Sequence, residues 1–159
     1  MKLYFLRHGI AADRDEWSGD DAERPLTAQG RKCMEHEAKA LAHLGIEPDR
    51  IVTSPLRRAK ETAEIVAERL GLDDHLAEDQ RLAEGFDVNA LAEMLRTYGD
   101  VDCLLLVGHE PDFSHTIGRL IGGARIDLKK GGLARVDIAD AASREGELVW
   151  LLPPKVLGA

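Results

Sequence analysis

The sequence contains only two cysteines, no long apolar run and no internal repeat. Cys33 and Cys103 are far apart, form no CxxC pattern and lie in apolar segments, so we expect buried reduced thiols rather than a disulfide, redox or zinc site. The first apolar run ends at Arg7 and is too short for a signal peptide or a membrane span, which predicts a cytoplasmic protein without a membrane partner. Because no linker or low-complexity tract interrupts the chain, we expect a single domain.

Positive charge is also scarce. The formal net charge is −8 at pH 7, with 21 lysine and arginine residues against 29 aspartate and glutamate residues. Most of such a surface repels nucleic acid and anionic lipid, so we expect neither as a partner. A phosphate-bearing ligand would need a local cluster of cations, and the positions of individual arginines therefore become informative.

The common signatures of nucleotide and metal enzymes are missing from the sequence. It has no GxxxxGK[ST] loop, no GxGxxG after its first apolar run and no GxSxG elbow. His109-Glu110 begins like a zinc-protease motif, but Phe113 stands where the second histidine would be and Pro111 interrupts the helix. We therefore expect no cofactor and no metal ion.

The first predicted strand ends on a pair of chemically useful side chains. Residues 3–6 are apolar without alternation, which indicates a strand buried on both faces of a parallel sheet, and Arg7 and His8 follow at once. Such sheets bind ligands just beyond the carboxyl ends of their strands. Taken alone, an arginine and a histidine at this place are more often ordinary loop residues than catalysts. The polar stretch 10–24 is expected to form a loop across the rim of the site.

A second predicted strand leads into a helix with an unusual first turn. Residues 51–53 predict the strand, and Ser54 is expected to cap the helix that follows. Arg57 and Arg58 then oppose the helix dipole, a penalty that a bound anion would reverse. Arg58 shares a helix face with Thr62, so we expect only one of the two arginines to reach the site.

The order of the elements predicts an α/β fold. A third strong strand is expected over residues 101–107, just before His109, and residues 133–138 and 148–152 predict an antiparallel hairpin at the sheet edge. With helices between the strands, the expected architecture is a three-layer α/β/α sandwich around a mostly parallel sheet with an antiparallel edge. One edge of the sheet should then form a pocket for a tetrahedral oxyanion from four side chains: Arg7, His8, Arg58 and His109.

These residues resemble the motifs of the histidine phosphatase superfamily. The similarity covers nearly the whole chain and depends on three motifs in order: Arg7-His8-Gly9, Ser54-Pro55 with Arg58, and Gly108-His109. The stretch 25–27 and the tail 150–154 look like those of its small bacterial phosphohistidine phosphatases, the SixA type.

The resemblance implies a fold, a domain organisation and residue roles. It implies a phosphoglycerate-mutase-like α/β/α fold and one histidine phosphatase domain over residues 1–159, without a separate lid domain. It also implies that His8 is the nucleophile and that Arg7, Arg58 and His109 hold the phosphoryl group. The chemistry is consistent with this reading, because the surrounding cations should lower the pKa of His8 and stabilise the charge of the transferring group without a metal ion.

The sequence offers one candidate for a general acid, Glu84. Related mutases and ester phosphatases have a glutamate acid after an L-x-E segment, which Leu82-Ala83-Glu84 resembles, but an exposed acid in a turn explains Glu84 equally well. Glu110, beside the second histidine, departs from the family pattern and puts a carboxylate near the phosphate pocket, where we expect it to point outward and orient a cationic substrate surface.

We expect a phosphatase that acts on protein phosphohistidine through a covalent phosphohistidine on His8, with a phosphate or sulfate ion able to bind the site. The alternatives are a phosphatase of small phosphate esters, favoured if Glu84 is the acid, and a non-catalytic phosphate-binding module.

Overall fold

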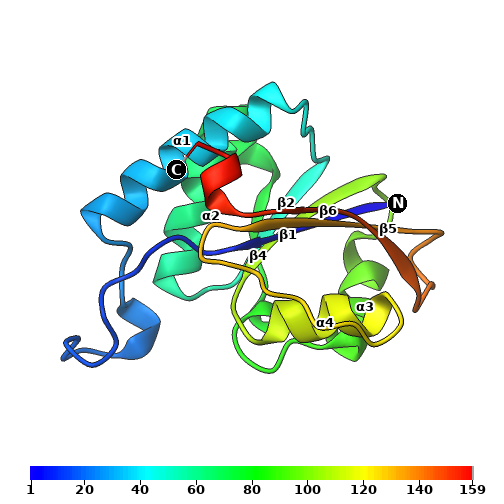
Figure 1. The fold of residues 1–159 in the computed structure, drawn as a ribbon. Coiled ribbons are helices and arrows are strands. Elements are labelled where there is room, and N and C mark those ends of the chain that lie inside the picture. The colour runs from blue at the N-terminus through cyan, green and yellow to red at the C-terminus, as the bar shows by residue number, and fades with distance from the viewer. Residues whose placement is uncertain (159) are drawn as a thin grey trace.

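The computed structural model describes residues 1–158, which form one six-stranded sheet with helices on both faces (Figure 1). The strands are β1 Lys2–Arg7, β2 Arg50–Thr53, β3 Leu76–Glu78, β4 Cys103–Gly108, β5 Leu133–Ile138 and β6 Gly146–Leu152. The main helices are α1 Ala28–His43, α2 Arg57–Leu70, α3 Val88–Tyr98 and α4 Asp112–Leu120. The strand order is β3-β2-β4-β1-β5-β6. Strands β1 to β4 pair in parallel, and β5 and β6 add an antiparallel edge, which confirms the predicted α/β class.

The sheet separates two hydrophobic cores. Alternate residues of the central strands point to opposite faces, so that Phe5 of β1 packs with α3 and α4, whereas Leu6 packs with α1 and α2. Figure 1 shows these two helix pairs on opposite sides of the sheet. Strand β4 is buried along its whole length, as expected for a central strand covered on both faces.

Local sequence signals set several of the helix ends. The Thr27 hydroxyl accepts a hydrogen bond from the Gly30 N–H and begins α1, and the Asp87 carboxylate caps α3 in the same way. Gly71 ends α2 in the left-handed region, with a φ of 70°. These ends need only neighbouring residues, which is why a sequence pattern can predict them.

The start of α2 differs from the prediction. The helix begins at Arg57 after Leu56, and Ser54 is not its N-cap. The Ser54 hydroxyl instead accepts from the Leu56 N–H at 3.2 Å and lies 2.7 Å from Nε2 of His109. His109 is 55 positions from Ser54 along the chain. Preferences for N-cap residues depend on neighbouring residues alone, so they could not predict this contact.

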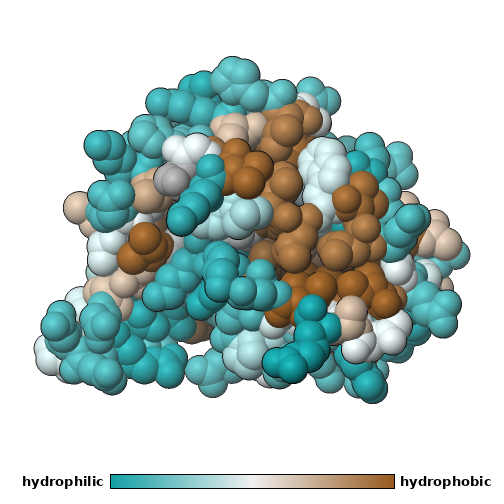
Figure 2. Space-filling view, in the orientation of Figure 1, coloured by the Kyte–Doolittle hydropathy of each residue, from teal (hydrophilic) through white to brown (hydrophobic). Residues whose placement is uncertain are grey.

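Strand β6 is a long edge strand with apolar side chains at the surface. Val149 is 40% exposed and Leu151 is 39% exposed, and Figure 2 shows apolar residues gathered over this side of the molecule. Both cysteines are free thiols. Cys103 is buried, as expected, whereas Cys33 is only partly buried, although the sequence predicted that both are buried. Within residues 1–158, no helix is both long and apolar enough to cross a membrane.

Candidate active site

Three neighbouring parallel strands bring the candidate residues to one edge of the sheet. In the register of the sheet, Arg7 at the end of β1 pairs with Gly108 of β4, and Thr53 at the end of β2 pairs with Val107. The residues that follow these strands therefore face the same space. They border a cleft of ≈ 690 Å³ that includes all four side chains expected to bind an oxyanion: Arg7, His8, Arg58 and His109.

His8 is held in one orientation at the base of this cleft. The residue is 6% exposed, and its Nδ1 lies 2.8 Å from the carbonyl oxygen of Gly9, which requires the proton on Nδ1. The other ring nitrogen, Nε2, then carries the lone pair. The Gly9 N–H donates to the Thr62 hydroxyl at 3.1 Å, and that hydroxyl donates to the Arg58 carbonyl at 2.7 Å, so the turn after β1 is tied to α2.

Both site histidines favour the uncharged form. Burial lowers the pKa of His8 to about 3, and His109, Arg58 and Arg7 add to the shift. Burial also lowers the pKa of His109 to about 4, with Arg58 as the next cause. The two rings lie 5.2 Å apart between centroids with an interplanar angle of 56°. Two neutral imidazoles therefore stand side by side among fixed cations.

The side chains of the two arginines in the first turn of α2 lie in different places. Arg58 is buried and borders the cleft, while Arg57 is half exposed and pairs with Glu61 at 3.0 Å. Arg7 donates from Nη1 to the Leu128 carbonyl at 2.9 Å, which fixes its guanidinium beside His8. One arginine from this turn therefore reaches the cleft, in agreement with its position relative to Thr62.

Asp21 is a partner of the site that the sequence did not reveal. Its carbonyl accepts from Arg58 Nη1 at 2.9 Å, and its carboxylate lies 3.2 Å from Arg58 Nη2 and 3.0 Å from Arg24 Nε. The segment that contains it crosses the rim, and Asp13, Arg14, Asp15 and Glu16 line the cleft with Arg24. Nothing in the local sequence distinguishes Asp21 from the other acids of this loop, because its partner lies 37 residues away.

Most of the buried polar atoms without a partner belong to residues that line the cleft. Among residues 1–158, four buried side-chain polar atoms have no hydrogen-bond partner, and three of them are Arg7 Nε, Arg58 Nε and His109 Nδ1. Buried polar atoms are nearly always paired, so such a group requires an explanation. Three nitrogen atoms around one cleft suit an oxyanion with several acceptor oxygens.

The two glutamates discussed from the sequence lie in different places. Glu84 is exposed in a turn and does not line the cleft. Glu110 lines the cleft, near the phosphate pocket as the sequence indicated, but its side chain bonds to Ser114 of α4 instead of pointing outward. Its carboxylate accepts from both the N–H and the hydroxyl of Ser114, so it caps the first turn of α4.

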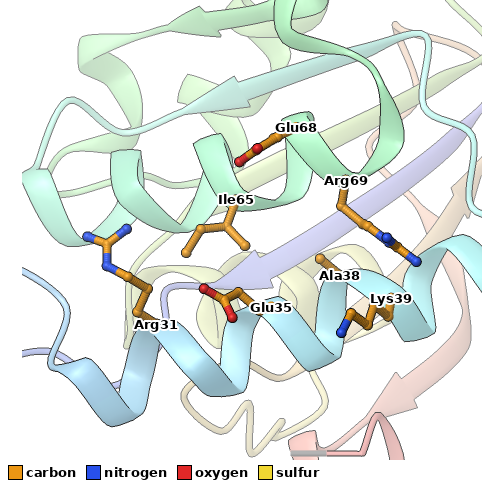
Figure 3. Close-up of a pocket in the computed structure, with 7 residues that line it drawn as sticks. All are labelled: Arg31, Glu35, Ala38, Lys39, Ile65, Glu68 and Arg69. Carbon is orange, nitrogen blue, oxygen red and sulfur yellow. The ribbon is translucent and has the colours of Figure 1, made fainter.

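A separate hollow of ≈ 450 Å³ lies between α1 and α2 (Figure 3). Arg31, Glu35 and Lys39 from α1 face Glu68 and Arg69 from α2, and none of these residues borders the cleft at the strand ends. Within the part of the chain that the structure describes, no group of three or more histidine, cysteine, aspartate or glutamate residues is arranged to hold a metal ion.

Comparison with known proteins agrees with this geometry. The chain is 39% identical to an uncharacterized protein of Picosynechococcus sp. over 99% of each chain, and 29% identical to the phosphohistidine phosphatase SixA of Escherichia coli over 97% of this chain and 94% of that protein. The structure of a protein histidine phosphatase SixA complexed with tungstate superposes with a TM-score of 0.87 at 27% identity, covering 99% of both chains. The profile of branch 1 of the histidine phosphatase superfamily matches residues 3–98, and the chain belongs to this superfamily.

Proposed function

We propose that this chain hydrolyses protein phosphohistidine through a covalent phosphohistidine on His8. Membership of the histidine phosphatase superfamily supports phosphatase activity, and the similarity to SixA along nearly the whole chain favours a phosphohistidine substrate. The observation that carries the proposal is that Arg7, Arg58 and His109, each with a buried nitrogen atom that has no partner, line the same cleft as the neutral His8.

His8 acts as the nucleophile in this proposal. With the proton on Nδ1 donated to the Gly9 carbonyl, Nε2 offers its lone pair to phosphorus. The bond between phosphorus and Nε2 forms while the phosphorus–nitrogen bond of the substrate breaks, and the released imidazole takes a proton from solvent. Water then attacks phosphorus, the bond to Nε2 breaks, and inorganic phosphate leaves with His8 restored.

The clamp neutralises the charge of the transferring group. Arg7 and Arg58 provide fixed positive charge through Nε and the remaining guanidinium N–H groups. In this proposal the Ser54 hydroxyl, which accepts from the Leu56 N–H, donates its own proton to Nε2 of His109, so that the ring proton of His109 lies on Nδ1. His109 then donates from Nδ1 to a phosphoryl oxygen. These cations and donors supply the stabilisation that a metal ion supplies elsewhere, and we propose a reaction without a metal.

The leaving group favours phosphohistidine over an ordinary ester. An alkoxide needs a proton from a general acid, and Glu84, the candidate from the sequence, is exposed and does not line the cleft. A leaving imidazole has a reference pKa of ~6.5 and is protonated readily by solvent. We therefore propose no catalytic role for Glu84. Phosphatase activity on small phosphate esters with good leaving groups remains compatible with the same clamp.

A labelling experiment tests the proposal. Purified protein is mixed with a ³²P-phosphohistidine protein, quenched in alkali at short times and compared with His8→Ala and Glu84→Gln. The wild type and Glu84→Gln should carry label and release phosphate, whereas His8→Ala should do neither. Release of phosphate at the wild-type rate by His8→Ala would refute the covalent mechanism. Binding without release by the wild type would instead indicate a non-catalytic phosphate-binding module.

A further inference from the structure

Glu37 is a buried carboxyl group that the proposed reaction does not use. It lies on the inner face of α1, is 1% exposed, and its Oε2 is the fourth buried polar atom without a partner among the described residues. The other three atoms belong to the phosphate clamp and have an explanation there. An unpartnered oxygen this deeply buried is costly, and its position indicates what it does.

Both carboxyl oxygens of Glu37 lie directly over Gly131. A Cβ atom on Gly131 would come within 2.5 Å of Oε1 and 2.6 Å of Oε2, so a side chain at this position would displace the carboxyl group. Gly131 also has a φ of 77°, in the left-handed region that favours glycine. The carboxyl group therefore packs on bare backbone.

That backbone holds the two residues at the end of β1. The Gly131 N–H donates to the carbonyls of Arg7 at 3.1 Å and His8 at 3.2 Å. The Gly132 carbonyl accepts from the Arg7 N–H at 3.1 Å, and the Leu128 carbonyl accepts from Arg7 Nη1 at 2.9 Å. These contacts connect the segment 128–132 to both the backbone and the guanidinium of the site.

We propose that Glu37 is a positioning residue for the phosphatase reaction: its carboxyl group packs on Gly131 and keeps the segment 128–132 where it aligns Arg7 and His8. This inference rests on the proposed function. Burial raises the pKa of Glu37 to about 8, so the carboxyl group is uncharged at neutral pH. The aligned site is therefore present below this pKa and is lost as the pH rises through it.

The surroundings of Glu37 provide little compensation for a negative charge. A cavity of ≈ 160 Å³ borders the carboxyl group, and the titratable side chains that line it are Cys33 of α1 and Lys130 of the segment 128–132. Within residues 1–158, neither makes a hydrogen bond or an ion pair with Glu37. Lys130 also borders the active-site cleft. A carboxylate at Glu37 would attract its ammonium group and pull the segment away from its position.

A pH profile tests the role of Glu37. The kcat/KM for p-nitrophenyl phosphate is measured from pH 7 to 9 for the wild type, for Glu37→Gln and Glu37→Met, and for Glu35→Gln, a control on the exposed face of the same helix. The wild type and Glu35→Gln should lose activity about ten-fold over this range, as expected for a group that ionises near pH 8, while both neutral variants stay flat. Identical alkaline losses in the wild type and both neutral variants would overturn the inference.

A second measurement separates this inference from the proposed function. The ¹⁵N chemical shifts of the Gly131 and Gly132 amides should titrate with a midpoint near pH 8 in the wild type and in Glu35→Gln, but not in Glu37→Gln. Amides that do not respond in the wild type would overturn the positioning role. If these amides titrate as expected while the wild type shows no phosphatase activity, the link from Glu37 to the segment is supported and the proposed function fails.

Discussion

Acidification is expected to leave the first chemical step nearly unchanged, because His8 stays unprotonated. Burial and the neighbouring His109, Arg58 and Arg7 hold the pKa of His8 at about 3. In the proposed reaction the imidazole of His8 attacks only when it is neutral, so the fraction of neutral His8 in the free enzyme should set kcat/KM. That fraction should remain near unity down to about pH 5.

The size of the effect follows from the shift. A histidine with the reference pKa of ~6.5 would be ~75% neutral at pH 7 and ~3% neutral at pH 5, a loss of about 25-fold. With the pKa at about 3, the neutral fraction at pH 5 is ~99% and the loss is negligible. Burial is the largest cause of the shift, so the prediction depends on how completely the turn after β1 excludes water.

The assay is the pH dependence of kcat/KM for p-nitrophenyl phosphate from pH 5 to 8. Its leaving group needs no general acid, and the rates are divided by the fraction of substrate dianion. The His8→Ala variant supplies the background rate. Circular dichroism at each pH checks folding, because the unfolded state binds a proton at His8 near pH 6.5 whereas the folded state does not, so stability falls with acidification below that value. A corrected kcat/KM that drops more than ten-fold by pH 5 in folded protein would refute the assigned state of His8.

Three further outcomes follow from the same structure. Arg58→Gln should lower kcat/KM by roughly 10²-fold to 10³-fold, the usual cost of a lost charge-stabilising donor. The neighbouring Arg57→Gln removes one partner of the Glu61 carboxylate, which keeps Arg31 and lies outside the cleft, so kcat/KM should stay within about two-fold. Equal losses in the two variants would contradict the different positions of the two arginines. Ser54→Ala should lower kcat/KM about ten-fold, because His109 loses the 2.7 Å contact that orients it, and a wild-type rate would show that its packing alone is sufficient. Urea denaturation should show that, as the pH rises from 4.5 to 8, the wild type loses up to about 4 to 5 kcal/mol of stability relative to Glu37→Gln, because only the folded state keeps the Glu37 proton until about pH 8. The two site histidines change the stability of both proteins with pH in the same way, so they cancel in this difference. Parallel curves would contradict a buried neutral carboxyl group.

Short-range patterns in the sequence determined the elements and the chemistry at their ends. The unbroken apolar runs of β1 and β4 predicted central strands, and the polar residues that follow each run then had to lie at one edge of the sheet. The same logic predicted that one arginine of α2 reaches the cleft. These inferences hold because strand and helix periodicity are set by neighbouring residues, and because crossovers between parallel strands follow a general rule of handedness.

Contacts between distant segments were decided only by the tertiary structure. Ser54 bonds to His109 instead of capping α2, Asp21 meets Arg58 from the rim, and Glu84 lies outside the cleft despite its sequence context. Glu37 belongs to the same group: its spacing from Met34 and Leu41 places it on the buried face of α1, but only the fold shows that Gly131 packs against its carboxyl group. Each of these depends on which loops pack together across the sheet, and a polar side chain with several possible partners is assigned to one of them only when the whole chain has folded.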